Sequence, residues 1–122
     1  MKKHLLLLIP LIIASVSSIH AQIKVEKYCQ VIVSPKGGFT NKRIAKISFG
    51  EDKSLFALKD TSEFEQLKYV NSLTTETDVL NYMSKIKWRL VNVHSFGLYT
   101  NAEVFYFVKG FGKSELTDTS SE

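Results

Sequence analysis

The apolar run VFYFVKG, which begins at Val104, is the feature that most constrains the fold of this chain. Val104, Tyr106 and Val108 alternate with Phe105 and Phe107, so a strand over this run is apolar on both of its faces. A strand of that kind normally lies inside a sheet. We therefore predict a sheet with this run in its interior.

Three earlier segments have the composition of strands. YCQVIVS is rich in β-branched residues, and the SPKGGFTN that follows it has the proline and paired glycines of a turn. RIAKISFG alternates again and ends at Gly50, so these two segments suggest a hairpin. WRLVNVHS begins at Trp88 and is joined to the last strand by FGLYTNAE, a loop or wide hairpin turn. The predicted strands span residues 28–34, 43–50, 88–95 and 104–110.

Residues 51–73 are harder to assign. SEFEQLKYVNSL fits a short helix through Phe64 and Leu67, but it also fits an extended segment through Leu67 and Tyr69. We favour extended pieces joined by a turn near Asp60.

Residues 76–87 carry the clearest helical pattern. At 100° per residue one set of apolar side chains falls within an arc of about 160°. Thr75 can cap this helix, and Glu76 and Asp78 suit its positive end. The apolar set is Val79, Leu80, Tyr82, Met83 and Ile86. Together the elements predict an α+β fold: a mostly antiparallel sheet of four or five strands, with one principal helix packed on one face.

Strand alternation predicts which face of the sheet the helix covers. The strongly apolar face comprises Cys29, Val31, Val33, Ala45, Ile47, Phe49, Val91 and Val93, and we assign it to the helix. The other face is mixed, with Tyr28, Ile32, Ile44, Trp88 and Leu90. Residues 51–73 could fold across this second face. Otherwise its apolar residues form an exposed patch of the kind that marks an interaction site.

The first 21 residues have the layout of a secretory signal peptide. Lys2 and Lys3 precede an apolar run from Leu5 to Ala14, and small residues follow before Ala21. The run is shorter than the ~20 residues a membrane-spanning helix needs, so we predict no permanent membrane anchor. We expect cleavage near Ala21 and export to the periplasm or the extracellular space.

Removal of this segment leaves a single small domain, residues 22–111, with a polar tail at residues 112–122 that we predict to be disordered. The loss of Lys2 and Lys3 leaves 14 basic and 12 acidic residues, a net charge of +2. So small a charge does not indicate a nucleic-acid partner.

The stretch DVLNYMSKIKWRLVNV, followed by EVFYFVKG, resembles small exported bacterial proteins of the domain of unknown function 4177 type. That resemblance covers residues 78–109 best and implies a small sheet packed on a helix, with no established activity. Lys87 stands where such sequences place glycine before the tryptophan. Glycine would leave the helix in a left-handed conformation at little cost, whereas lysine there costs roughly 1 kcal/mol. Either the helix ends differently here or the protein tolerates the strain.

No pattern of catalytic residues is compelling, and we predict that the protein is not an enzyme and needs no metal or cofactor. GFGKS lacks the first glycine of a phosphate-binding loop and is followed by a polar tail. Cys29 and His94 are the one Cys/His combination in the mature chain. We expect Cys29 to be a buried, inert core thiol. The acidic pairs suit a turn, a loop and a helix start.

We therefore expect a non-catalytic domain that acts by contact with an unknown protein partner or with itself as a homodimer. Ile32 and Ile44 are candidates for such an interface. The alternative is a module that binds a small ligand or glycan on an aromatic platform of Trp88, Tyr82 and Tyr99. Tryptophan at a helix-to-strand junction more often closes the core, so contact is the favoured interpretation.

Overall fold

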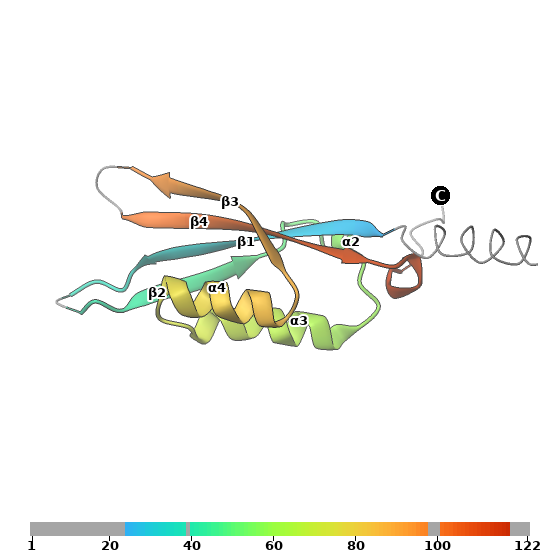
Figure 1. Ribbon diagram of the computed structural model, residues 1–122, viewed down its shortest axis with the longest axis horizontal. Helices are drawn as coiled ribbons and strands as arrows, with labels where there is room; N and C mark the ends of the chain where they lie inside the picture. The colour runs from blue at the N-terminus through green and yellow to red at the C-terminus, as the bar shows by residue number, and fades with distance from the viewer. Residues whose placement is uncertain (1–23, 39, 98–100, 118–122) are drawn as a thin grey trace, which may run out of the picture.

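The computed structural model describes residues 24–38, 40–97 and 101–117, with the exception of the Lys53 side chain. A four-stranded sheet lies against a layer of helices (Figure 1). The elements, in chain order, are β1 (Val25–Pro35), β2 (Arg43–Ser48), α2 (Lys53–Phe56), α3 (Thr61–Lys68), the 3-10 helix η1 (Tyr69–Ser72), α4 (Glu76–Lys85), β3 (Arg89–Phe96), β4 (Ala102–Phe111) and the 3-10 helix η2 (Lys113–Glu115).

The sheet is antiparallel throughout, in the order β2-β1-β4-β3. The prediction that the strand with two apolar faces lies inside the sheet is confirmed, because β4 pairs with β1 on one side and β3 on the other. Val31 is opposite both Ile47 and Phe105, which shows how one row of side chains crosses three strands. β2 and β3 form the two edges.

The predicted α+β class is confirmed, and the helices cover one face of the sheet, although Val91 and Val93, predicted on that face, are 43% and 42% exposed. Side chains of β1, β2 and β4 on this covered face are almost inaccessible to solvent: Cys29, Val31, Val33, Ala45, Ile47, Phe105 and Phe107. Two helices cover the face instead of one, because α3 lies beside α4 (Figure 1). The two are tied at Tyr82, whose hydroxyl donates to the Gln66 carbonyl at 2.9 Å.

The prediction of extended structure between residues 51 and 73 is wrong. Asp60 caps α3 by accepting from the Ser62 amide at 2.9 Å, so the residue that we assigned to a turn begins a helix. Leu67 and Val70 are fully buried at a spacing of three residues, which is a helical spacing. The buried side chains of this segment join the same core as α4, so it does not cross the other face of the sheet.

The end of α4 decides between the two alternatives for Lys87. Its φ angle is +71°, the left-handed conformation that glycine adopts more easily. The Lys87 amide donates to the Ser84 carbonyl at 3.0 Å, and the Trp88 amide donates to the Met83 carbonyl at 2.9 Å. These two bonds satisfy the last carbonyls of the helix. The helix therefore ends as a glycine-terminated helix does, and the protein carries the strain.

A bulge in β3 overturns part of the predicted face assignment. The register shifts between Leu90 and Asn92, so Val91 is an extra residue in the strand. Leu90 consequently lies opposite Phe107 on the covered face. Trp88 precedes the strand and belongs to the core cluster. Both residues were predicted on the other face, because strict alternation cannot reveal an inserted residue.

The structure tests only part of the predictions for the two ends of the chain, the polar tail and the signal peptide. Residues 113–117, expected in a disordered tail, form η2 and a bridge between Leu116 and Leu58. The boundary of the ordered domain therefore moves past residue 112. Residues 1–23, with the expected signal peptide, and residues 118–122 lie outside the described residues. Within the described part of the chain, no helix is long and apolar enough to cross a membrane.

Candidate functional site

The predicted aromatic platform is not assembled in the described residues. Trp88 is 2% exposed, and its ring lies parallel to that of Phe56 at 6.1 Å between centroids. Tyr82 lies instead against Tyr69 on the helical layer, at 4.8 Å between centroids. Tyr99 falls outside the described residues. Trp88 closes the core, as its position between helix and strand indicated.

A polar cluster that the sequence did not reveal holds this corner of the core together. Glu63 Oε1 accepts from Trp88 Nε1 at 2.9 Å and from Lys109 Nζ at 2.8 Å. Lys109 Nζ also donates to the Ile86 carbonyl at 3.0 Å. The cluster thus joins α3, the end of α4 and β4. Its groups satisfy one another, which is the arrangement that a structural ion pair needs when it is largely removed from water.

Cys29 and His94 do not form a catalytic pair. Cys29 is buried on the covered face, whereas His94 is opposite Val104 on the other face of the sheet. Burial, with a smaller contribution from the negative charge of Glu63, raises the pKa of the Cys29 thiol from 9.0 to about 12. The thiol is therefore protonated at neutral pH and is a poor nucleophile. Among the described residues, no cluster of His, Cys, Asp and Glu could hold a metal ion.

Ile32 and Ile44 share the face of the sheet that the helices leave open. Ile44 is 46% exposed in β2, and Ile32 is half-buried in β1. Ile32 is opposite Lys46, and Gln30 is opposite Ser48 on the same face. Polar side chains therefore flank the two isoleucines across β1 and β2. On β4, by contrast, Val104, Tyr106 and Val108 follow one another along the same face, with Val104 opposite Ile32, and the two valines are buried.

β3 is the most exposed strand of the sheet. All eight of its residues are exposed, and four of them are large and apolar: Leu90, Val91, Val93 and Phe96. From Leu90 to Phe96 the strand has no Lys, Arg, Asp or Glu. Natural edge strands are normally protected by charges, proline, a bulge or a covering segment. The central six residues of β3 carry no formal charge and no proline, and no strand among the described residues pairs with their outer edge, so the bulge at Val91 is the one such feature of the strand.

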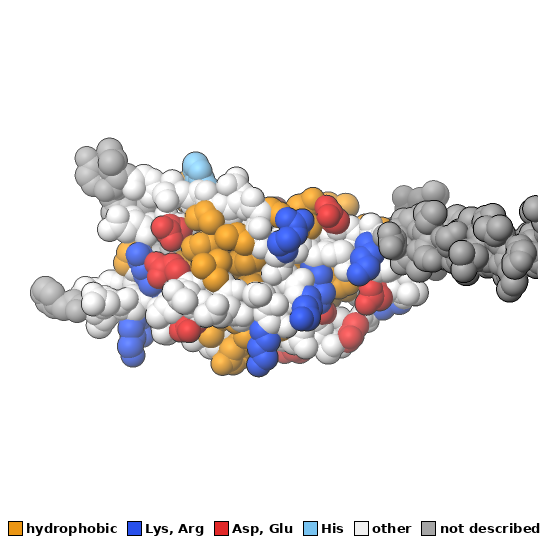
Figure 2. Space-filling view, in the orientation of Figure 1, with side chains coloured by type: hydrophobic (Ala, Val, Ile, Leu, Met, Phe, Trp, Pro, Cys, Tyr) orange, Lys and Arg blue, Asp and Glu red, His pale blue; other side chains and the backbone are white. Residues whose placement is uncertain are grey.

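A groove runs beside β3 on the helical side. It has a volume of about 530 Å³ and is lined by Leu80 and Ser84 of α4, Leu90 of β3 and Phe107 of β4, together with Lys87, Trp88 and Arg89. Figure 2 shows an apolar area between β3 and α4. Beyond the groove, Val93 lies on the same face of β3 as Leu90 and is 42% exposed. We call the exposed side chains of β3 from Leu90 to Phe96, with Leu80, the β3 surface.

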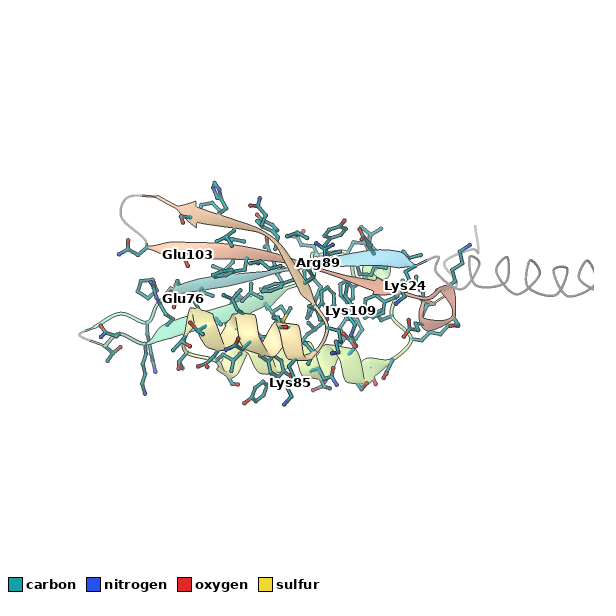
Figure 3. The ribbon with its side chains drawn as sticks, viewed as in Figure 1. Lys24, Glu76, Lys85, Arg89, Glu103 and Lys109 are labelled. Carbon is teal, nitrogen blue, oxygen red and sulfur yellow. The ribbon has the colours of Figure 1, made fainter. Side chains whose placement is uncertain are left out.

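Charges of opposite sign mark the two ends of the β3 surface (Figure 3). Glu76 and Glu103 lie at one end, where Arg43 compensates one charge by pairing with Glu76 at 2.8 Å. Lys85, Lys87 and Arg89 lie where α4 passes into β3. Among the described residues, no salt bridge engages Glu103 or any of these three cations.

A second hollow, of about 310 Å³, lies between α3 and the end of β2. Phe49, Phe56 and Phe64 line it, with 5.3 to 5.7 Å between their ring centroids. The three rings therefore pack mainly on one another. This hollow is an extension of the core packing and offers few polar groups to orient a ligand.

Comparison with models of protein families, with curated proteins and with solved structures gives no match. The resemblance to the domain of unknown function 4177 therefore stays a prediction.

Proposed function

We propose that this protein is an exported, non-catalytic domain that acts by protein–protein contact through the β3 surface. The observation that carries the proposal is the eight-residue edge strand β3, which is exposed along its whole length and uncharged from Leu90 to Phe96. Monomeric proteins rarely leave such an edge open, because its backbone is a template for another strand. A partner that covers the edge would remove this liability.

Both components of a strand-addition site are present at this edge. The outer backbone of β3 offers hydrogen-bonding groups, and the groove beside it offers apolar contacts for alternate side chains of an added strand. On β3 itself, the Val93 amide donates to Asn92 Oδ1 at 2.9 Å, a local side-chain bond within the strand.

A non-catalytic role is supported by the chemistry of the groups that could react. The Cys29 thiol is buried and protonated, and the Glu63 and Lys109 charges neutralise each other inside the fold. The β3 surface includes His94 and Ser95, but they lie on opposite faces of the strand, opposite Val104 and Glu103, and so do not form a nucleophile–base pair. Its composition suits binding.

Site-specific photo-crosslinking in the native host tests the contact. A photoreactive phenylalanine analogue at Val93 is expected to give a discrete cross-linked species. The matched control is Ile44, which has nearly the same exposure, 46% against 42%, on the other edge strand. Cross-linking at neither position would refute contact through the sheet, and cross-linking at Ile44 alone would move the contact to the open face.

Export is tested separately. We expect mass spectrometry of the protein from its native host to give a chain that begins at or near Gln22. Recovery of the intact 122-residue chain from the cytoplasm would contradict export.

The alternative function, a small-ligand or glycan site, is tested by native tryptophan fluorescence. Trp88 is the one tryptophan of the chain, and it is buried. We expect a blue-shifted emission that saccharides and short peptides leave unchanged. An emission typical of exposed tryptophan, quenched by one of these ligands, would favour the binding module over the contact domain.

A further inference from the structure

We propose that the open face of the sheet carries a second binding site, for a neutral saccharide, in a hollow beside Tyr28 and Tyr106. The hollow has a volume of about 330 Å³ and lies where β1, β4 and the end of β2 meet. Small-ligand sites have volumes of this order. The groove beside β3 is lined from the covered face, by Leu90 and Phe107, so the saccharide site does not depend on the proposed contact function.

Two tyrosines provide the aromatic surface of this hollow. Tyr28 is opposite Val108, two residues along β4 from Tyr106, so both rings lie on the open face. Tyr28 is 57% exposed, and its hydroxyl donates to Glu26 Oε2 at 2.9 Å, which limits the motion of the ring. The electron-rich face of an aromatic ring attracts the C–H groups on one face of a sugar ring. Tyr28 therefore offers an exposed and oriented surface for such a contact.

A row of neutral polar side chains crosses the sheet beside these rings. Gln30 is opposite Ser48 on one side and Tyr106 on the other, and Tyr106 is opposite Asn92. Within the part of the chain that the structure describes, the Gln30 amide and the Tyr106 hydroxyl have no hydrogen-bond partner. Both groups can donate and accept, as the hydroxyl groups of a sugar require.

The side chains around the hollow select the class of ligand. None of the residues that line it is charged, so an ion would find no compensating group there. A wholly apolar ligand would remove Gln30 and Ser48 from water and give them no partner in exchange. A saccharide has an apolar face for the tyrosine rings and hydroxyl groups for the polar row.

A second hollow, of about 230 Å³, gives the site length. It shares Tyr28 and Phe49 with the first hollow and continues to Leu55. Its two charged residues already have partners, because Glu26 accepts from Tyr28 and Lys27 Nζ donates to the Leu55 carbonyl at 2.6 Å. An oligosaccharide can therefore extend past Tyr28, whereas a single sugar would occupy only the first hollow.

Isothermal titration calorimetry of the purified protein tests the site with three neutral tetrasaccharides, of β-linked glucose, β-linked N-acetylglucosamine and α-linked mannose. We expect saturable binding of at least one, with a dissociation constant below about 1 mM. Tyr28→Ala should weaken this binding by about tenfold, because it removes the aromatic contact. Tyr69→Ala is the matched control: it removes a ring of nearly the same exposure, 54% against 57%, from the helical layer and should leave the affinity unchanged. Circular dichroism shows whether each variant is folded.

Two conservative variants separate recognition from a structural role. Tyr28→Phe keeps the ring and should retain most of the affinity. Gln30→Leu removes the amide at similar volume and should weaken binding about threefold to tenfold. Saturable binding of none of the three saccharides, equal weakening by Tyr28→Ala and Tyr69→Ala, or tighter binding of the acidic tetrasaccharide of galacturonic acid would overturn the proposal. Trp88 lines neither hollow, so this result is independent of the fluorescence test of the Trp88 platform.

Discussion

The two edge strands of the sheet differ in whether a later segment of the chain lies along their outer edge. β2 leads into α2, α3 and η1, and this segment returns along the β2 edge, where Asn71 and Thr74 accept backbone amides. β3 leads through a short connection into β4, and none of the later residues that the structure describes pairs with its outer edge. The exposure of the β3 edge therefore depends more on the path of the chain after the strand than on the composition of the strand.

The beginning of β3 is nevertheless fixed to the core. Trp88, the residue before the strand, is buried against Phe56 and Phe111, and its indole donates to Glu63. From Leu90 onward the strand is held mainly by β4. β3 thus has an anchored start and an exposed remainder.

Replacement of the anchor should have the largest effect. We expect Trp88→Ala to lower the free energy of unfolding by about 3–5 kcal/mol, since it leaves a cavity and removes a donor from Glu63. Chemical denaturation of the monomer measures it, with Val93→Ala as the control at less than about 1 kcal/mol because Val93 is exposed. A loss below ~1 kcal/mol for Trp88→Ala would mean that the start of β3 is not anchored.

Much of the fold could be predicted because its signals are local. The two apolar faces of β4 placed it inside the sheet, and Thr75 marked the start of α4, where its Oγ1 accepts from the Asp78 amide at 3.1 Å. The helix α3 was missed because Phe64 and Leu67 fit two periodicities, and the choice depends on burial against distant strands.

The candidate site was harder to predict than the fold. Ile32 and Ile44 were placed on an uncovered face correctly, but β3 shows the same valine-rich pattern as the buried strands. Which edge strand remains exposed depends on where residues 51–73 pack. The alternation of β3 is also interrupted by the bulge at Val91. Glu63 and Lys109 are 46 residues apart, so no local pattern could pair them.

A variant that removes Asn71 from the β2 edge tests whether the returning segment protects this strand. Asn71→Ala removes the acceptor of the part-buried Ile47 amide, and we expect a loss of about 1–3 kcal/mol in unfolding free energy. Amide hydrogen exchange at Ile47 should accelerate. Asn71→Asp keeps an oxygen in place and should retain most of the stability. Equal losses for both variants would show that packing, and not this hydrogen bond, protects the edge.

The exclusion of water from the covered face can be tested through the titration of the Cys29 thiol. Its pKa is raised to about 12, mainly by burial, so folding favours the neutral thiol. The resulting stability is complete below the ordinary pKa of 9.0 and is lost as the pH rises from there toward 12. We expect the thiol to contribute about 1 kcal/mol of destabilisation between pH 8 and pH 10. Cys29→Ala should lack this part of the pH dependence, and identical slopes for the two proteins would indicate that the covered face admits water.

The smallest effect concerns the passage from α4 into β3. Lys87 holds a φ angle of +71°, and glycine adopts this conformation without the steric cost of a Cβ atom. We expect Lys87→Gly to raise the free energy of unfolding by about 0.5–1 kcal/mol, after allowance for the greater freedom of glycine in the unfolded chain. Lys87→Ala removes the same charge and keeps the strain, so it isolates the backbone effect and should give no gain. Thermal and urea unfolding of the three proteins at one concentration measure the difference. If the glycine variant were no more stable than the alanine variant, the strain at the start of β3 would be negligible, and anchoring of this strand would rest on Trp88 and its polar cluster alone.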